Sequence, residues 1–255
     1  MNKSFAELLR RHQWETFAAV WAHTADAAVA KKMRTDRITL RFKLDDNGTQ
    51  RAFYIKRHVR SSWKECIKPL LRLTWPILGA RNEWRAILDF HEVGLATMTP
   101  VALGESGVNS FLITEALENC VKLSEINANY VDGASIDDLR IRLIRDVARI
   151  ARKMHGAGMH HQDFYLGHLM QSQSNAGIIY VIDLGRVQKQ AQLSRRWIVK
   201  DLAQLDFSAQ VSPRERLRFL REYLGRRLAG SDRSLVADIQ TKAEAIARHS
   251  RKNRL

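Results

Sequence analysis

Two aspartates, Asp163 and Asp183, lie twenty positions apart in surroundings that suit phosphoryl transfer. Asp163 is in the polar segment His161–His168, which follows a long helix-like stretch, and Asp183 comes directly after the apolar run Ile178–Ile182. In such a unit of helix, loop and strand, one carboxylate can accept or orient the proton of an attacking hydroxyl, while the other holds a metal ion that bridges nucleotide phosphates. We therefore predict that Asp163 is the catalytic residue and that Asp183 binds the metal.

This segment resembles the catalytic loop and the metal-binding motif of protein kinases, which read His-Arg-Asp, four residues and Asn, and then Asp-Phe-Gly. Asp163 takes the position of the catalytic base, His168 that of the Asn, and Asp183 that of the metal-binding Asp. The resemblance implies ATP and Mg²⁺ as cofactors, with His168 and Asp183 as metal ligands. It also implies that His161 supports the catalytic loop.

Other residues resemble further parts of a kinase in the same order along the chain. Lys56 ends a strand, as the phosphate-pairing lysine does, and Glu83 lies on the next helix, where a kinase places the acid that pairs with it. Glu115 and Leu117 follow a strand, where kinase backbone groups bind adenine. Asp201 lies where related small-molecule kinases carry an aspartate that supports the catalytic loop. A lone lysine or glutamate is more often a surface residue, but the shared order favours a nucleotide site.

Hydrophobic periodicity predicts the elements that position these residues. Residues 1–30 are expected to form a helical lead-in, and strands are expected near 38–42, 52–56, 111–113 and 178–182. A hairpin turn is expected at Asp45–Gly48. Helices are expected across 139–154, from about residue 200 onward, and after Pro76 and Gly79, there with Trp84, Ile87, Leu88 and His91 on one face.

The order of these elements predicts an α+β, two-lobed, protein-kinase-like fold. The whole chain, residues 1–255, is interpreted as a single kinase-like domain. Its strand-rich N-lobe is expected over about 30–117 and its helical C-lobe over about 118–255.

Three departures from protein kinases bear on the substrate. Gln162 replaces the Arg that forms an ion pair with a phosphate on the activation loop, and a neutral amide cannot form that ion pair. Only 18 positions separate Asp183 from Asp201, which leaves no room for a long activation loop or a peptide platform. The first expected hairpin, at Asp45–Gly48, has no repeated glycines, so Lys56 is expected to carry more of the phosphate binding. The first two features disfavour control by loop phosphorylation and peptide substrates.

The chain is strongly basic, with a net charge of +15 over 255 residues. Such a surface favours a polyanion, which could be nucleic acid, an anionic membrane face or a phosphorylated substrate. Zinc-finger spacing, an RNP-type strand and a basic zipper are all missing, so no nucleic-acid partner is expected. Cys66 and Cys120 have neither metal-ligand nor redox spacing, and no apolar run approaches about 20 residues. We expect a cytoplasmic protein.

Several runs resemble lipopolysaccharide core kinases of the inner-core heptose type. They are Ile77–Ala86, Thr97–Pro100, His161–His168, Ile182–Arg186 and Lys200–Ala203, and the resemblance extends over roughly residues 38–225. It implies transfer of the ATP γ-phosphate to a core heptose hydroxyl, with Mg²⁺, at the cytoplasmic face of the inner membrane. The lipid A-core part of lipopolysaccharide is then the substrate.

Two basic segments suit an anionic membrane face or the glycolipid itself. Lys56–Lys64, continued through Lys68, Arg72 and Trp75, mixes cations with aromatic residues. Arg214–Arg227 repeats cations on a helical pattern with apolar residues between them, although such a helix more often packs its apolar face on its own domain. Peripheral contact with the anionic inner membrane face is therefore expected.

The sequence is also compatible with other functions. A pseudokinase or scaffold is suggested by the missing glycine-rich loop and by His168 at the Asn position. The acceptor could be Kdo or a second heptose position instead of the first heptose. A polyanion-binding protein would show salt-steep DNA binding without phosphate transfer. Aminoglycoside kinases recruit cationic substrates with acidic side chains, which does not suit this basic chain.

Overall fold

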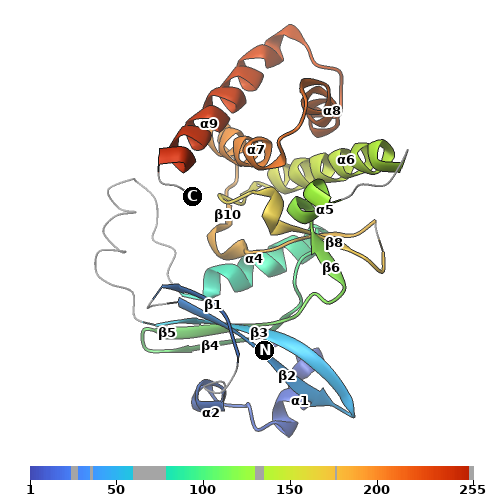
Figure 1. Cartoon of the computed structure of the whole chain (residues 1–255). Coiled ribbons are helices and arrows are strands. Elements are labelled where there is room, and N and C mark those ends of the chain that lie inside the picture. Colours follow the sequence, from blue (N-terminus) through green and yellow to red (C-terminus); the bar gives the residue numbers. More distant parts are fainter. Residues whose placement is uncertain (24–27, 35–36, 60–78, 130–134, 176, 253–255) are drawn as a thin grey trace. The chain divides into compact units, whose positions relative to one another are not determined.

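The computed structural model describes the chain except for residues 24–27, 35–36, 60–78, 130–134, 176 and 253–255 (Figure 1). It divides into two compact units. Unit 1 comprises Met1–Asp89 and Met98–Glu118, and unit 2 comprises Phe90–Thr97 and Asn119–Leu255. Most of the basic segment from Lys56 to Trp75 lies outside the described residues.

Unit 1 is built on a five-stranded antiparallel sheet in the order β1-β2-β3-β5-β4 (Figure 1). The strands are β1 (Ala28–Arg34), β2 (Arg37–Asp46), β3 (Thr49–His58), β4 (Pro100–Ser106) and β5 (Asn109–Glu115). The turn between β2 and β3 has positive φ at both central residues, Asn47 (56°) and Gly48 (84°), as two-residue hairpins require. The hairpin predicted at Asp45–Gly48 is thus confirmed.

The N-terminal part of the chain differs from its expected form. The helical lead-in is short: the 3-10 turn η1 (Lys3–Phe5), α1 (Ala6–Arg11) and α2 (Phe17–His23) precede a strand, β1, that had not been expected. The hairpin at Asp45–Gly48 is therefore preceded by the pairing of β1 with β2, and its prediction as the first hairpin of the sheet was wrong. Alternation is hard to see in β1 because the register with β2 shifts twice along its length.

One face of the unit 1 sheet packs against α1 and α2 (Figure 1). Alternating residues of β3, Phe53 and Ile55, are fully buried on this face, and Phe5, Leu9 and Trp14 of the N-terminal segment are buried in the same cluster. Because side chains alternate across a strand, the neighbours of Phe53 and Ile55 in β3 point to the other face. Lys56 is one of these neighbours.

Helix α4 (Arg81–Glu92) follows the segment that lies outside the described residues. Its buried face carries Glu83, Ala86 and Ile87, whereas Leu88 is 46% exposed and His91 is exposed. The helix predicted after Gly79 is confirmed and Ile87 is buried as expected, but the predicted buried face was wrong at Leu88 and His91. The buried positions are three and four residues apart, as predicted, but they begin at Glu83, one position before Trp84. A search for hydrophobic residues does not find Glu83, because it carries a carboxylate.

Unit 2 is mainly helical. Its helices are α5 (Leu123–Asn129), α6 (Ser135–Gly156), α7 (Arg195–Ala209), α8 (Pro213–Leu224) and α9 (Arg233–Lys252). A small sheet in the order β6-β8-β9 uses β6 (Cys120–Lys122), β8 (Leu169–Ser172) and β9 (Ile179–Val181), and β7 (Met159–His160) pairs with β10 (Gln188–Lys189). The described part of the unit also contains three 3-10 turns: η3 (Leu166–His168), η4 (Leu184–Arg186) and η5 (Gly230–Asp232).

The helix predicted at 139–154 is confirmed as the central part of α6, which buries Val147 and Met154. α8 begins with a capping box in which Ser212 and Glu215 each accept from the other's backbone amide, and it ends at Gly225 in the left-handed conformation. Leu220 and Tyr223 of α8 are buried. The described helices include none with the length and apolar character needed to cross a membrane.

Candidate active site

In unit 1, β3 and α4 bring Lys56 and Glu83 together. The Lys56 Nζ donates to Glu83 Oε1 at 2.6 Å, and the two side chains are 28% and 4% exposed. The lysine head therefore keeps access to solvent while its partner carboxylate is buried. These are the two residues predicted to bind nucleotide phosphates, and their role in binding stays a prediction.

Glu115 and Leu117, the predicted adenine segment, lie at and just after the end of β5. The Glu115 amide donates to the Thr99 carbonyl at 3.0 Å, and the Ala116 amide donates to the Ala52 carbonyl at 2.9 Å. Both of these donors are engaged inside unit 1. Adenine contacts by this segment would therefore fall to the Glu115 carbonyl or to the backbone of Leu117.

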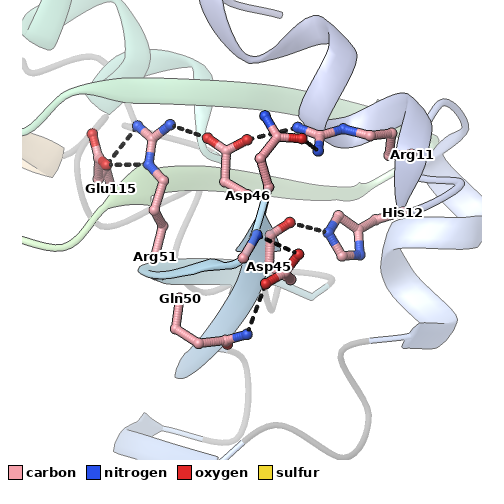
Figure 2. A network of polar contacts seen from close by, with 9 residues as sticks. Arg11, His12, Asp45, Asp46, Gln50, Arg51 and Glu115 are labelled. Carbon is pink, nitrogen blue, oxygen red and sulfur yellow. Dashed lines mark hydrogen bonds and ion pairs between the residues drawn. The ribbon is translucent and has the colours of Figure 1, made fainter.

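The Glu115 side chain belongs to a network of ion pairs at the edge of unit 1 (Figure 2). Arg51 contacts Glu115 Oε1 at 2.7 and 2.9 Å and also donates to Asp46 at 2.7 Å. Arg11 of α1 donates to the same Asp46 at 2.6 Å, and His12 contacts the Asp45 carbonyl at 2.9 Å. Arg51, followed by Arg11, holds the pKa of Asp46 below its ordinary value. The network ties α1 and the β2–β3 hairpin to the end of β5.

In unit 2, a polar stripe on α7 holds the loop that carries Asp163. Asp201 Oδ2 accepts from the His161 amide at 2.7 Å and Oδ1 from the Gln162 amide at 2.8 Å. Gln204 Oε1 accepts from the Phe164 amide at 3.1 Å, and Ser208 Oγ accepts from the Leu166 amide at 2.8 Å. Positions 201, 204 and 208 share one helix face. Three side chains thus satisfy four loop amides that would otherwise be costly to bury.

The buried carboxylate of Asp201 is the centre of this arrangement. It has no exposed surface, and His155 lies beside it, with Nε2 at 3.4 Å from Oδ2 and Nδ1 at 2.9 Å from the Tyr223 hydroxyl. Burial alone would raise the pKa of Asp201, but the contacts from His155 and from the His161 amide outweigh burial and lower the pKa. Asp201 therefore stays ionised and keeps both oxygens available as acceptors.

Asp163 lies in this anchored loop with its carboxylate 25% exposed. Arg186 Nη1 lies 3.0 Å from both Oδ1 and Oδ2 of Asp163. Gln162 Nε2 donates to the Arg186 carbonyl at 2.9 Å, so the residue that replaces the kinase Arg contacts the segment after Asp183. Gln162 and Asp183 both have positive φ, 71° and 60°, which is uncommon outside glycine and typical of functional sites.

Asp183 and His168 lie together, as the metal prediction requires, with His168 Nε2 at 3.8 Å from Asp183 Oδ2. His168 Nδ1 contacts the Asp163 carbonyl at 2.7 Å, which orients the ring so that Nε2 faces Asp183. His161 Nε2 donates to the Ile182 carbonyl at 3.0 Å and so connects the loop to the segment before Asp183. The carboxylate suits Mg²⁺, whereas an imidazole nitrogen is a weaker ligand for this hard cation. Within the described part of the chain, no three His, Cys, Asp or Glu side chains form a metal-binding group.

Sequence reasoning did not identify Arg186, Gln204 or Ser208 as parts of this site. Gln204 and Ser208 had a detectable signal: with Asp201 they repeat polar residues at helical spacing, next to the apolar neighbours Leu202 and Leu205. Arg186 had no such signal, because its contact with Asp163 depends on how two loops meet.

The model of the lipopolysaccharide kinase (Kdo/WaaP) family matches residues 18–223 of the chain. The chain belongs to this family. Among curated proteins, the lipopolysaccharide core heptose(I) kinase WaaP of Pseudomonas aeruginosa is 38% identical over 234 residues, which cover 86% of this chain and 85% of the relative. The WaaP protein of Escherichia coli K12 is 34% identical over 266 residues, which cover 94% and 98%.

Solved structures agree with this family assignment. A structure of WaaP in complex with acyl carrier protein has a TM-score of 0.74 and 32% identity, covering 94% of this chain and 96% of that one. An aminoglycoside-3'-phosphotransferase of type VIII has a TM-score of 0.52 at 13% identity, covering 94% and 99%, and supports the fold alone. The predicted α+β, protein-kinase-like fold and the resemblance to lipopolysaccharide core kinases are confirmed. This family member is a kinase, a phosphotransferase with an alcohol group as acceptor.

Proposed function

We propose that this lipopolysaccharide kinase transfers the γ-phosphate of ATP, with Mg²⁺, to a hydroxyl of an inner-core heptose. The proposal rests on one combination: the heptose(I) kinases of two organisms match the chain over most of its length, and Asp163 lies in a loop anchored beside Asp183. Kdo or a second heptose position would use the same chemistry with a different acceptor. A pseudokinase is not favoured, because the Asp163 and Asp183 carboxylates are both present and partly exposed.

In the proposed reaction, Asp163 orients the sugar hydroxyl and accepts its proton as the new bond from oxygen to phosphorus forms. The bond between the γ-phosphorus and its bridging oxygen breaks, and ADP leaves with the electron pair. Lys56, held by Glu83, binds nucleotide phosphates. Asp183 and His168 would hold Mg²⁺. When bound, Mg²⁺-ATP supplies the phosphoryl group and neutralises charge that develops on the phosphate oxygens.

The test is phosphate transfer to lipopolysaccharide that lacks core phosphate, measured by mass spectrometry. The wild type should add one phosphate to a core sugar, and Asp163→Ala should lower the rate by on the order of a hundredfold or more. Asp238→Asn, which changes a half-exposed carboxylate on α9, is the matched control and should keep wild-type activity. Fragmentation of the product identifies the sugar. Tight ATP binding without transfer would instead support a pseudokinase or another acceptor.

We also propose peripheral contact with an anionic inner membrane face, where a glycolipid acceptor is embedded. α8 presents exposed Arg214, Arg218 and Arg221 together with Leu217, which is 50% exposed. Cations beside an exposed apolar side chain suit the headgroup region of an anionic bilayer.

We further propose that this chain binds an acyl carrier protein, as the WaaP protein of the similar solved complex does. Unit 2 contains an apolar cavity of about 130 Å³, lined by residues of α6, α7 and α8 that include Leu139, Leu143, Val147, Leu205, Phe219 and Leu220. Such a cavity suits a hydrocarbon chain. The net charge of +15 suits a partner with an acidic surface.

A comparison of acylated with unacylated carrier protein tests this interaction. The acylated form should raise the thermal unfolding midpoint of the kinase more than the unacylated form does, since only it carries a chain to fill the cavity. Leu143→Arg should remove the difference, whereas Leu217→Arg, at an exposed position of α8, should keep it. Equal effects of both carrier forms would contradict the cavity assignment.

A further inference from the structure

The catalytic loop has a cation bound to it that the phosphoryl-transfer scheme above does not use. Arg186 ends the turn η4, and its Nη1 contacts both carboxylate oxygens of Asp163 at 3.0 Å. The arginine side chain is 53% exposed, so it can shift toward a ligand without leaving a buried position. The contact holds the carboxylate that must meet the acceptor hydroxyl. Arg186 is therefore placed to orient Asp163.

A second cation, Lys200, lies in the same neighbourhood on α7. Its Nζ is 5.2 Å from the ring centroid of Trp197, and the side chain is half-buried. Burial lowers the pKa of Lys200, and the charge of Arg186 lowers it further, while Asp163 acts in the opposite direction. Lys200 is thus close enough to feel the charges of both Arg186 and Asp163.

Positive charge exceeds negative charge around this point. Lys242 of α9 also lies within electrostatic reach of Lys200, which gives three cations. The facing carboxylates are Asp163 and Asp201, and both Asp201 oxygens already accept backbone amides inside unit 2. Asp201 is ionised and its charge counts as well, so two carboxylates face the three cations Arg186, Lys200 and Lys242, and one positive charge is left over. A partly desolvated excess of cations is unfavourable unless an anion binds there.

We propose that Arg186 and Lys200 bind an anionic substituent of the acceptor, a carboxylate or a phosphate near the sugar hydroxyl that is phosphorylated. This rests on the proposed function. In this arrangement, Arg186 keeps one Asp163 oxygen in place as a positioning residue and turns its remaining donors toward the acceptor anion. Lys200 supplies the second charge. The pair selects a hydroxyl that has an acidic group beside it, and a neutral sugar would bind poorly.

The acceptor explains the cation pair better than the nucleotide does. Arg186 contacts Asp163, the residue assigned to the acceptor hydroxyl, whereas the phosphates are assigned to Lys56 and to the metal at Asp183. Guanidinium groups bind carboxylate and phosphate with several parallel hydrogen bonds, which fixes orientation as well as affinity. A ligand held by Arg186 is therefore fixed relative to Asp163.

Steady-state kinetics with full-length protein test the proposal. Arg186→Gln and Lys200→Gln should each raise KM for the lipopolysaccharide acceptor by about tenfold or more, while KM for ATP stays within about twofold. Arg186→Gln should also lower kcat, because Asp163 loses its orienting partner. Lys200→Arg keeps the charge that Lys200→Gln removes, so its KM for the acceptor should be close to the wild-type value. Arg186→Lys should also bring KM for the acceptor back toward the wild-type value, but it should recover less of kcat. Arg248→Gln on α9 is the control with the same loss of charge.

Two modified acceptors identify the anion. One has its carboxyl groups reduced to alcohols, and the other has its phosphates removed. The acceptor that lacks the recognised group should bind the wild type at least as weakly as the intact acceptor binds Lys200→Gln, because it loses the contact with Arg186 as well, and Lys200→Gln should then have no further effect. Equilibrium binding of each acceptor without ATP gives the same comparison independently of turnover.

The outcomes separate the proposal from the function on which it depends. If the wild type does not phosphorylate the intact acceptor, the proposed function itself is wrong. If it does, but the two Gln variants raise KM for ATP and not for the acceptor, the cations bind the nucleotide and the proposal is overturned. The proposal is also overturned if Lys200→Gln weakens the binding of each modified acceptor by the same factor as it weakens the binding of the intact acceptor.

Discussion

The two units hold their charged site residues in different ways. In unit 1, Lys56 is held through its side chain, whose Nζ donates to Glu83, and the lysine remains 28% exposed. In unit 2, Asp163 is held through its backbone, because Asp201, Gln204 and Ser208 accept the amides of the loop on which it lies. One unit positions a side chain, and the other positions a segment of main chain.

Because of this difference, substitutions in the two units should affect activity and stability in different proportions. The lysine head of the Lys56–Glu83 pair reaches water, so neutralising the buried Glu83 leaves no unpaired charge in the interior, and the pair can serve binding at small structural cost. A buried carboxylate that accepts two amides is different, because its loss leaves donors without partners in a site that water does not reach. A substitution at Asp201 should therefore lower both the free energy of unfolding and the activity. A substitution at Glu83 should lower the activity alone.

The largest effect is expected for Asp201→Asn. The amide keeps one acceptor oxygen but places an NH₂ group against a loop amide, which should lower the free energy of unfolding by about 2–3 kcal/mol. Displacement of Asp163 should lower phosphate transfer on the order of a hundredfold. Urea unfolding and initial rates measure the two quantities.

A matched control for this variant is Asp238→Asn, which changes the half-exposed pair with Arg195. It should alter stability by less than about 1 kcal/mol and leave the transfer rate unchanged. If Asp201→Asn were as stable and as active as this control, the loop would not depend on the α7 stripe.

A smaller and purely functional effect is expected for Glu83→Gln. The amide oxygen can still accept from Lys56, so unfolding should change by no more than about 1 kcal/mol. Loss of the charge should loosen Lys56 and lower kcat/KM for ATP by about tenfold or more. Glu105→Gln, which removes the charge that pairs with Arg81 at the start of the same helix, should leave ATP kinetics unchanged. A large stability loss with normal kinetics would reverse the comparison between the units.

The last expected effect appears only at acid pH, and it comes from a buried histidine of unit 2. His160 is fully buried, stacks on Trp197 at 4.2 Å, and has no hydrogen-bond partner for either ring nitrogen among the described residues. Burial lowers its pKa to about 4. Between about pH 6.5 and 4 the unfolded chain binds a proton that the folded chain excludes, so stability falls as the pH falls, by about 3 kcal/mol across this window.

His160→Phe keeps an aromatic ring against Trp197 and removes the titrating group. Urea unfolding at pH 6.5 and pH 4.5 should show a shallower loss of stability in this variant than in the wild type. An identical loss in both proteins would assign the acid sensitivity to other groups.

Much of the fold followed from local pattern. The long helix α6, the strands β2 and β3 with their hairpin, and the strand β9 were expected because apolar periodicity and turn residues act over a few positions. β1 was missed because register shifts break its alternation, and the face of α4 was misassigned because one buried position holds a glutamate. The residues of the site were found by their order along the chain, and their roles in catalysis stay predictions until they are tested.

The amino-acid sequence by itself determined which chemical groups are available and in what order: a lysine ending a strand, an acid on the next helix, and two aspartates twenty positions apart. Only the tertiary structure decided which groups meet. Arg186 reaches Asp163 across 23 positions, and Gln204 and Ser208 reach loop amides across 40 and 42. Such contacts depend on how helices and loops pack, and no short-range pattern records the partner. Propensity and periodicity act locally, whereas burial and hydrogen bonding are settled once distant segments are packed together.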